Sequence, residues 1–226
     1  MKLQKILQER LTVSDKKPGI LGKEEYYFNS SVAVLLAELQ GELNFVFEKR
    51  VEGISQGREI CFPGGMYEPE VDCTYKEAAL RETIEELGVS RNMIRVVGQL
   101  DTLVAPMGAT VDSFVSLLEI GDLDDLSPNE GEVAEVITVP LQYFRRHQPE
   151  KYHVRLEIQP YYTDTGGEKE ILFPANELGL PERYRRPWGG KKYPLFVYEV
   201  KGEAIWGITA QLVREVVNIL DDIPEI

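Results

Sequence analysis

The feature that most constrains the fold is a helix pattern at residues 74–87, which follows a short strand pattern and a glycine turn. Apolar residues repeat at helical spacing among charged ones, and Gly88 supplies a C-terminal stop. Upstream, residues 59–62 predict a strand that runs into Pro63-Gly64-Gly65, a tight backbone turn. A strand, a turn and an amphipathic helix in this order indicate an α/β arrangement.

Strand patterns surround this helix on both sides. Residues 31–38 form an apolar run that predicts a strand buried on both faces, and residues 209–220 predict a closing amphipathic helix. We therefore expect an α/β fold with a mixed sheet and few flanking helices, in one domain spanning residues 1–226. Further strands are predicted at 43–49, 94–100, 111–120, 135–139, 154–162, 169–173, 193–200 and 204–206, with 169–173 pairing to 154–162, and helices at 2–11 and 141–147.

Composition excludes several classes of protein. The 226 residues carry a formal net charge of −13, which repels phosphate backbones and disfavours nucleic-acid binding. No apolar run approaches the length of a membrane span, and residues 1–10 are charged and amphipathic, unlike a signal peptide. Two cysteines without a CxxC and only two histidines predict neither a disulfide framework nor a zinc site. We expect a cytoplasmic protein that does not bind membranes or nucleic acid.

Three carboxylates on the predicted helix point to a metal. Glu82, Glu85 and Glu86 stand at i, i+3 and i+4, so they share one helix face and repel one another. Glu85 and Glu86 also lie in the last turn, where the helix dipole favours cations. Hard divalent cations bound by carboxylate oxygens would offset both penalties. The competing interpretation is a solvated charged face, which is common on surface helices.

The residues Arg81-Glu82-Thr83-Ile84-Glu85-Glu86-Leu87-Gly88-Val89, preceded by Gly64-Gly65, resemble the Nudix box, G-x5-E-x7-R-E-U-x-E-E-x-G-U, with U aliphatic. Thr83 replaces an aliphatic residue, and the first box glutamate falls on Cys73. A two-residue insertion in the loop would explain that departure and would leave Glu70 or Asp72 in its place. The resemblance implies a Nudix-type α/β/α sandwich, with residues 1–29 as a helical extension, about 150–200 as family-specific strands and a loop, and 207–222 as the closing helix.

The resemblance also implies a site and a reaction. Glu82, Glu85, Glu86 and the carbonyl of Gly65 would bind Mg²⁺ or Mn²⁺, and Arg81 would orient the carboxylates. Water activated by the metal would attack one phosphorus of a diphosphate. Nudix enzymes often take a general base from a later acidic loop, where this chain has Glu130 and Glu132. We favour Glu132, which directly precedes a predicted strand, although a solvated acidic loop is an equally good interpretation.

Segments outside the box resemble one group within the Nudix superfamily, and this resemblance bears on the substrate. Phe47-Glu48-Lys49-Arg50 and the segments 57–65, 98–103 and 205–210 are similar to stretches of coenzyme A diphosphatases in the Nudix superfamily. Members of that group split coenzyme A into phosphopantetheine and adenosine 3′,5′-bisphosphate. Gln56-Gly57-Arg58-Glu59 differs from the His-x-Gly-Glu common in the group. ADP-ribose or a nucleotide sugar is therefore an alternative substrate. A catalytically silent domain that senses a nucleotide is an alternative function.

A basic cluster near the C-terminal strands is a candidate substrate contact. Its side chains could meet a 3′-phosphate and an adenine ring, although an exposed loop that pairs with acidic surface is the simpler interpretation. We predict Arg50, Arg185 and Lys191 as residues that bind a small-molecule nucleoside diphosphate, and a homodimer is compatible with the sequence. The cluster consists of Arg183, Arg185, Arg186, Lys191 and Lys192 around Trp188.

A second catalytic motif is weaker. Gly53-Ile54-Ser55-Gln56-Gly57 fits G-x-S-x-G, the nucleophile elbow of α/β-hydrolases. That elbow lies between a strand and a helix, whereas a strand is predicted directly after Gly57. Only His147 and His153 could act as the base. We therefore do not expect a serine hydrolase.

Overall fold

The structure is a computed structural model, and it describes residues 19–221. The predicted helix at 2–11 and most of the predicted extension at 1–29 lie outside the described residues. The main sheet has eight strands, with the order β3-β2-β1-β7-β5 and with β4, β6 and β8 attached to β1, β7 and β2. Its strands are β1 (Phe28–Leu39), β2 (Glu42–Arg50), β3 (Ile60–Cys61), β4 (Gly64–Met66), β5 (Ile94–Gln99), β6 (Leu103–Ala105), β7 (Ala109–Leu118) and β8 (Val133–Pro140).

The sheet is mixed, as the sequence predicted. Strand β1 runs parallel to β7 and antiparallel to β2 and β4. Residues 33–37 of β1 are all buried, which confirms the prediction that this strand is covered on both faces. One layer of helices can bury only one face of a sheet. A strand that is buried on both faces therefore needs a cover on each side of the sheet.

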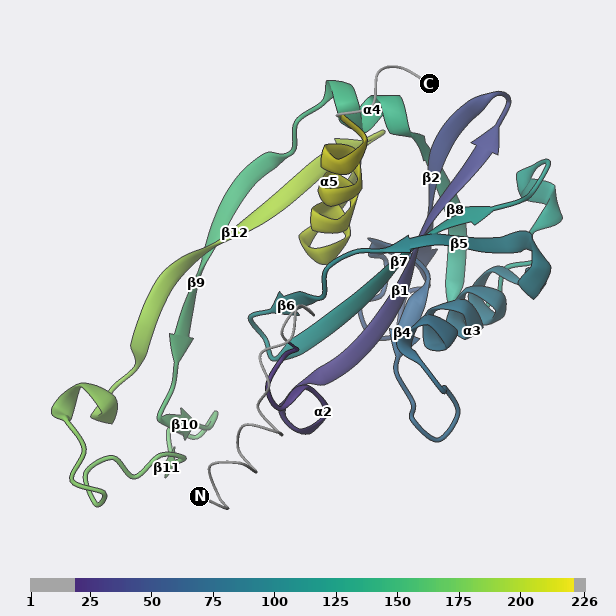
Figure 1. Cartoon of the computed structure of the whole chain (residues 1–226). Coiled ribbons are helices and arrows are strands. Elements are labelled where there is room, and N and C mark those ends of the chain that lie inside the picture. The colour runs from purple at the N-terminus through teal and green to yellow at the C-terminus, as the bar shows by residue number, and fades with distance from the viewer. Residues whose placement is uncertain (1–18, 222–226) are drawn as a thin grey trace, which may run out of the picture.

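Two helix layers supply that cover (Figure 1). Helix α3 (Tyr75–Leu87) packs on the face that carries Ala33, Leu35 and Ala37. Helices α4 (Leu141–Arg146) and α5 (Gly207–Asp221) enclose the other core, which contains Val34, Leu36 and the aromatic side chains of β2. The expected α/β/α sandwich is therefore confirmed, and the site helix α3 has one face of the sheet largely to itself. A further short helix, α2 (Lys23–Tyr26), precedes β1.

A long β-ribbon extends from this sandwich (Figure 1). We call β9 and β12, with the chain between them, the arm; β12 also pairs with β13 and so joins the arm to α5. The predicted pairing of residues 154–162 with 169–173 is wrong for most of its length, because β9 pairs with β12 and only β10 pairs with β11. The strands are β9 (Glu150–Ile158), β10 (Tyr161–Thr163), β11 (Lys169–Ile171), β12 (Trp188–Val200) and β13 (Glu203–Trp206).

Strand β12 begins five residues before the predicted strand at 193–200. A register shift between Gly189 and Lys191 extends the pairing with β9, and both Gly189 and Gly190 have positive φ values, 97° and 70°. Glycine adopts such angles readily, so a segment with loop composition continues the strand through a bulge. Among the helices that the structure describes, none is both long and apolar enough to cross a bilayer.

Candidate metal-binding active site

Helix α3 begins and ends at capping residues that hold it in place. The Thr74 side chain accepts a hydrogen bond from the Glu77 amide at 3.2 Å, and Gly88 closes the helix with φ 64°. A Cβ at Gly88 would lie 2.0 Å from the carbonyl oxygen of Ser127. The following loop therefore packs directly on the helix end, where the amides of Ser127 and Asn129 donate to the carbonyls of Leu87 and Glu86.

The two glycines of β4 bring backbone against the helix carboxylates. A Cβ at Gly65 would lie 2.4 Å from the carboxyl carbon of Glu82, and one at Gly64 would lie 2.4 Å from the Ser31 carbonyl oxygen. The Gly64 amide donates to Glu86 Oε2 at 2.9 Å. Only residues without a side chain fit between β1 and α3 here, so the Gly-Gly pair is required by close approach.

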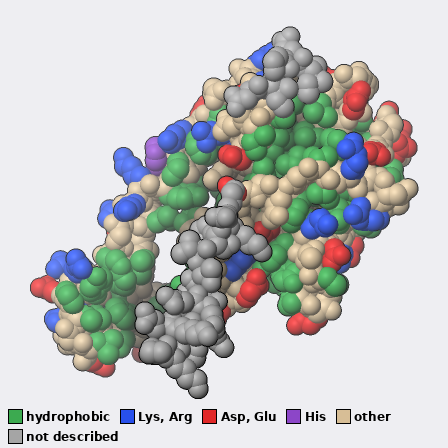
Figure 2. Space-filling view, in the orientation of Figure 1, with side chains coloured by type: hydrophobic (Ala, Val, Ile, Leu, Met, Phe, Trp, Pro, Cys, Tyr) green, Lys and Arg blue, Asp and Glu red, His purple; other side chains and the backbone are tan. Residues whose placement is uncertain are grey.

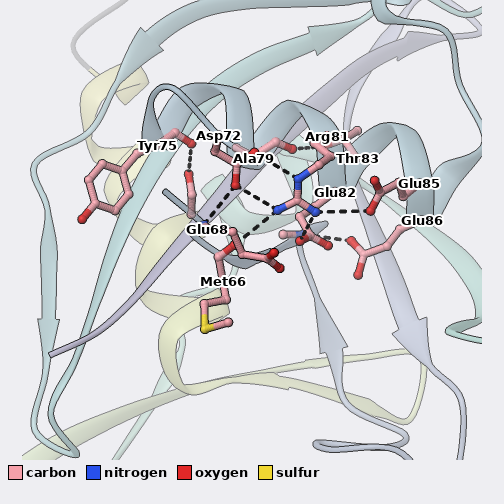
Figure 3. Close-up of polar contacts among 12 residues, drawn as sticks. Met66, Glu68, Asp72, Tyr75, Ala79, Arg81, Glu82, Thr83, Glu85 and Glu86 are labelled. Atoms are coloured by element: carbon pink, nitrogen blue, oxygen red, sulfur yellow. Dashed lines mark hydrogen bonds and ion pairs between the residues drawn. The ribbon is translucent and has the colours of Figure 1, made fainter. Parts of the chain in front are cut away.

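Arg81 connects the helix carboxylates to the loop before the helix (Figure 3). Its guanidinium makes a bidentate pair with Asp72, Nε to Oδ1 and Nη2 to Oδ2, both at 3.0 Å. Nη1 donates to Glu82 Oε1 at 2.8 Å and to Glu85 Oε2 at 3.3 Å. The hydrogen bonds from Arg81 lower the pKa of Asp72. Of the two candidates for the missing box glutamate, buried Asp72 faces Arg81, whereas Glu70 is exposed.

The three helix carboxylates have different surroundings. Glu86 is 2% exposed, and burial, followed by the charge of Glu48, raises its pKa to about 8. Burial also raises the pKa of Glu82, against the opposing effect of Arg81. The Glu85 side chain is 55% exposed and faces solvent beyond Arg81. The cluster thus has a buried end at Glu86 and an open end at Glu85, which suits a bound ion that must also contact a substrate.

Glu48 is not among the site residues that the sequence pattern predicts. Strand β2 places it beside Glu86, and Arg50 Nη1 lies 3.3 Å from Glu48 Oε1 and 3.4 Å from Glu86 Oε1. Glu48 is fully buried, and burial raises its pKa. A charged residue at the end of the apolar strand pattern Phe45-Val46-Phe47 was the signal that could have revealed it.

The acidic loop brings one of its two candidates to the site. Glu132 is half-buried, its carbonyl accepts from the Val51 amide at 2.9 Å, and its charge contributes to the raised pKa of both Glu48 and Glu82. Glu130 is exposed. The docking of the loop on the end of α3 explains this placement, because β8 begins at Val133 and must run beside β2.

The predicted substrate residues do not lie together. Arg50 contacts the buried carboxylates, whereas Arg185 and Lys191 are exposed and belong to the arm. The segment between β11 and β12, which holds Arg185, lies at the far end of the arm from α3 (Figure 1). Within one chain these two residues therefore do not share a site with the carboxylates, and their substrate role stays a prediction.

Ser55 lies in an exposed loop between β2 and β3. Two strands flank this loop, so the strand-to-helix turn of a nucleophile elbow is absent at this position. His147 stacks on Tyr143 at 4.2 Å instead of approaching the serine loop. This agrees with the expectation that the chain is not a serine hydrolase.

The donor atoms fit a hard divalent cation, although the side chains are not arranged around one. Within residues 19–221 no group of three or more His, Cys, Asp or Glu side chains already has metal-binding geometry. Arg81 and Arg50 occupy the carboxylate oxygens instead. Two observations favour a hard divalent cation: the donors are carboxylate oxygens, and the buried Glu48 Oε2 has no hydrogen-bond partner among residues 19–221.

The chain is similar to several known proteins. A mouse protein named peroxisomal coenzyme A diphosphatase is 37% identical over 153 residues, which are 67% of this chain and 60% of that protein. A human protein named mitochondrial coenzyme A diphosphatase is 34% identical over 129 residues, 55% of this chain and 53% of that protein. The chain thus spans little more than half the length of these relatives. The crystal structure of a Caenorhabditis elegans Ap4A hydrolase complex superposes with a TM-score of 0.43 at 19% identity, over 51% of this chain and 83% of that one.

The NUDIX domain model matches residues 28–158, which is more than half of the chain and includes β1, β4, α3 and the loop that carries Glu132. The matched region contains the buried carboxylates, the glycine pair and Arg81. The chain therefore belongs to the Nudix family.

Proposed function

We propose that this chain is a divalent-metal-dependent hydrolase that cleaves the diphosphate bond of a nucleoside diphosphate derivative. The observation that carries the proposal is the close approach of two α3 carboxylates to the glycine pair, with Glu82 against Gly65 and Glu86 accepting a hydrogen bond from the Gly64 amide. Such a concentration of carboxylates, one of them almost fully buried, is destabilising for an isolated protein and favourable for binding a cation.

The residues of the chain have separate roles in this proposal. Glu82, Glu85, Glu86 and the Gly65 carbonyl would hold Mg²⁺ or Mn²⁺, which when bound neutralises the diphosphate and makes a coordinated water more acidic. Arg81 positions Glu82 and Glu85 through its hydrogen bonds and is itself held by Asp72. Glu132 would accept a proton from the attacking water. Arg50, already beside the carboxylates, would turn toward the diphosphate once a cation replaces it there.

Coenzyme A is the proposed substrate, with phosphopantetheine and adenosine 3′,5′-bisphosphate as products. Support comes from the mouse and human relatives, which are named coenzyme A diphosphatases, and from the segments that resemble that group. We propose a cytoplasmic location, although these two relatives are named for the peroxisome and the mitochondrion. The proposed oligomeric state is a homodimer, which light scattering coupled to gel filtration would test.

A panel of diphosphates tests the assignment. Coenzyme A, ADP-ribose and a nucleotide sugar would each be incubated with the protein and Mg²⁺ or Mn²⁺, and products separated by chromatography. We expect cleavage of coenzyme A at the diphosphate, dependent on the cation and suppressed by a chelator. Cleavage of ADP-ribose but not coenzyme A would overturn the substrate and leave the reaction class intact. Ligand binding without any product would favour the catalytically silent sensor.

A further inference from the structure

The position of Glu48 in the sheet is unusual for a charged residue. Side chains alternate along β2, so Phe45 and Phe47 face the α5 core while Val46 faces the α3 core. Glu48 follows on the face of Val46, and β2 is paired there on both edges, with Cys61 of β3 and Val136 of β8. The register therefore places a carboxylate under the end of α3, at a point where a core side chain would otherwise stand.

Its hydrogen bonding leaves the carboxylate only half satisfied. Oε1 lies 3.3 Å from Arg50 Nη1, which is long for a hydrogen bond between nitrogen and oxygen, and accepts from the weak donor Cys61 Sγ at 3.5 Å. Oε2 is buried and has no hydrogen-bond partner within the described part of the chain. A buried carboxylate oxygen without a partner costs a few kcal/mol, so a sheet position that retains one needs a compensating ligand.

Among the residues that the structure describes, positive charge near Glu48 is too scarce to supply that compensation. A single guanidinium nitrogen of Arg50 is shared between Glu48 and Glu86, both of which are almost fully buried. Arg81, the arginine on α3, directs its bidentate contact to Asp72. The charge of Glu132 adds to the negative potential at Glu48. One divalent cation between the sheet and the helix would correct this imbalance.

We propose that Glu48 is a ligand of the divalent cation, so that the metal is held between a carboxylate of the sheet and the carboxylates of α3. The inference rests on the proposed metal site, and extends it from the helix to strand β2. Its rival is a purely structural role, in which Glu48 and Glu86 share a proton and Glu48 has no part in binding a metal.

Titration of the full chain with Mn²⁺ separates these roles, because free Mn²⁺ is measured directly by electron paramagnetic resonance without substrate. We expect Glu48→Gln to weaken Mn²⁺ binding about 10- to 100-fold, the range seen when groups that support a metal site are removed. Glu48→Met, which replaces the buried charge by an apolar side chain of similar length, should give the same loss. Glu42→Gln, at the exposed start of the same strand, is the matched control and should bind as the wild type does.

Thermal melting supplies the second readout. Without metal, Glu48→Met should melt at or above the wild-type temperature, because a buried like charge beside Glu86 has been removed. The rise in melting temperature on adding Mn²⁺ should be smaller than in the wild type. Wild-type Mn²⁺ affinity in both folded Glu48 variants, together with loss of binding in Glu86→Gln, would overturn the role of Glu48 and leave the hydrolase site standing. Absence of Mn²⁺ binding in the wild type would overturn both.

Discussion

The carboxylate site under α3 and the arm formed by β9 and β12 differ in what they bury. At the site, Glu48 and Glu86 are 0% and 2% exposed, so charge has been moved into the interior. Along β9, every residue is exposed, and alternate positions carry Tyr152, Val154, Leu156 and Ile158 on one face. Figure 2 shows hydrophobic side chains gathered toward the end of the arm, with Lys and Arg nearby.

Each region contributes an unfavourable free energy to the folded state that the rest of the chain does not offset. Buried charge without a counter-ion is destabilising, and a two-stranded ribbon with an exposed apolar face is marginally stable in water. The two regions differ in how specifically each one indicates the ligand or partner that would stabilise it. Oxygen donors of defined chemistry point to a cation, whereas an apolar face indicates no particular partner. We therefore assign chemistry to the first region and expect the arm to contribute little to it within one chain.

The largest effect should come from Glu86→Gln. Loss of a charged ligand removes several kcal/mol of stabilisation from the reaction, so kcat with Mg²⁺ should fall by about a thousandfold. Glu77→Gln, at the exposed first turn of the same helix, should keep normal activity. Circular dichroism would check that both variants are folded. Normal turnover in Glu86→Gln would mean that the carboxylate site, like the arm, is not needed for the reaction.

A smaller effect is expected from Gly65→Ala. The new Cβ would lie 2.4 Å from the Glu82 carboxyl carbon, so that carboxylate must move. Displacing a catalytic group by about 1 Å can cost about 100-fold in rate, and we expect a loss of about 10- to 100-fold in kcat/KM. The matched control is Gly98→Ala on β5, where a Cβ would meet no atom of the described residues within 4 Å. Equal activity of the two variants would contradict the close approach at Gly65.

The metal-free protein should lose stability as the pH rises. The folded-state pKa of Glu86 is raised to about 8 from an ordinary 4.5, so the folded chain holds a proton that the unfolded chain releases. Stability from this group is complete below pH 4.5 and is lost progressively as the pH rises through 8. We expect the melting temperature in a chelating buffer to fall over this window, and to fall less in Glu86→Gln. Addition of Mn²⁺ should reduce the fall, and a flat profile would count against the buried carboxylate.

The smallest effect is expected from the double variant Arg185→Ala with Lys191→Ala. Both side chains are exposed on the arm, away from α3, and exposed charges contribute roughly 1 kcal/mol or less. We expect kcat/KM for coenzyme A to change by less than about fivefold. A much larger loss would mean that the arm meets the substrate, which in this geometry requires a second copy of the chain, and gel filtration with light scattering would then be decisive.

The local signals in the sequence were reliable where the structure is local. Helix α3 occupies 75–87 against an expected 74–87, because its apolar spacing, the Thr74 cap and the Gly88 stop act within a few residues of one another. The predicted strands of the main sheet formed for the same reason, with ends shifted by a few residues. Pairing between strands joins residues that are far apart in the chain. In the arm, β9 pairs with β12 and not with β10, the next strand in the sequence.

The sequence by itself determined the family, the helix and the carboxylates at 82, 85 and 86, because a spacing along a helix is also a placement on its face. Only the tertiary structure decided that Asp72 rather than Glu70 holds Arg81, and that Glu132 rather than Glu130 approaches the site. It alone brought Glu48 under Glu86. Those contacts join residues far apart in the chain, and they depend on sheet register and loop docking, which no spacing between neighbouring residues encodes.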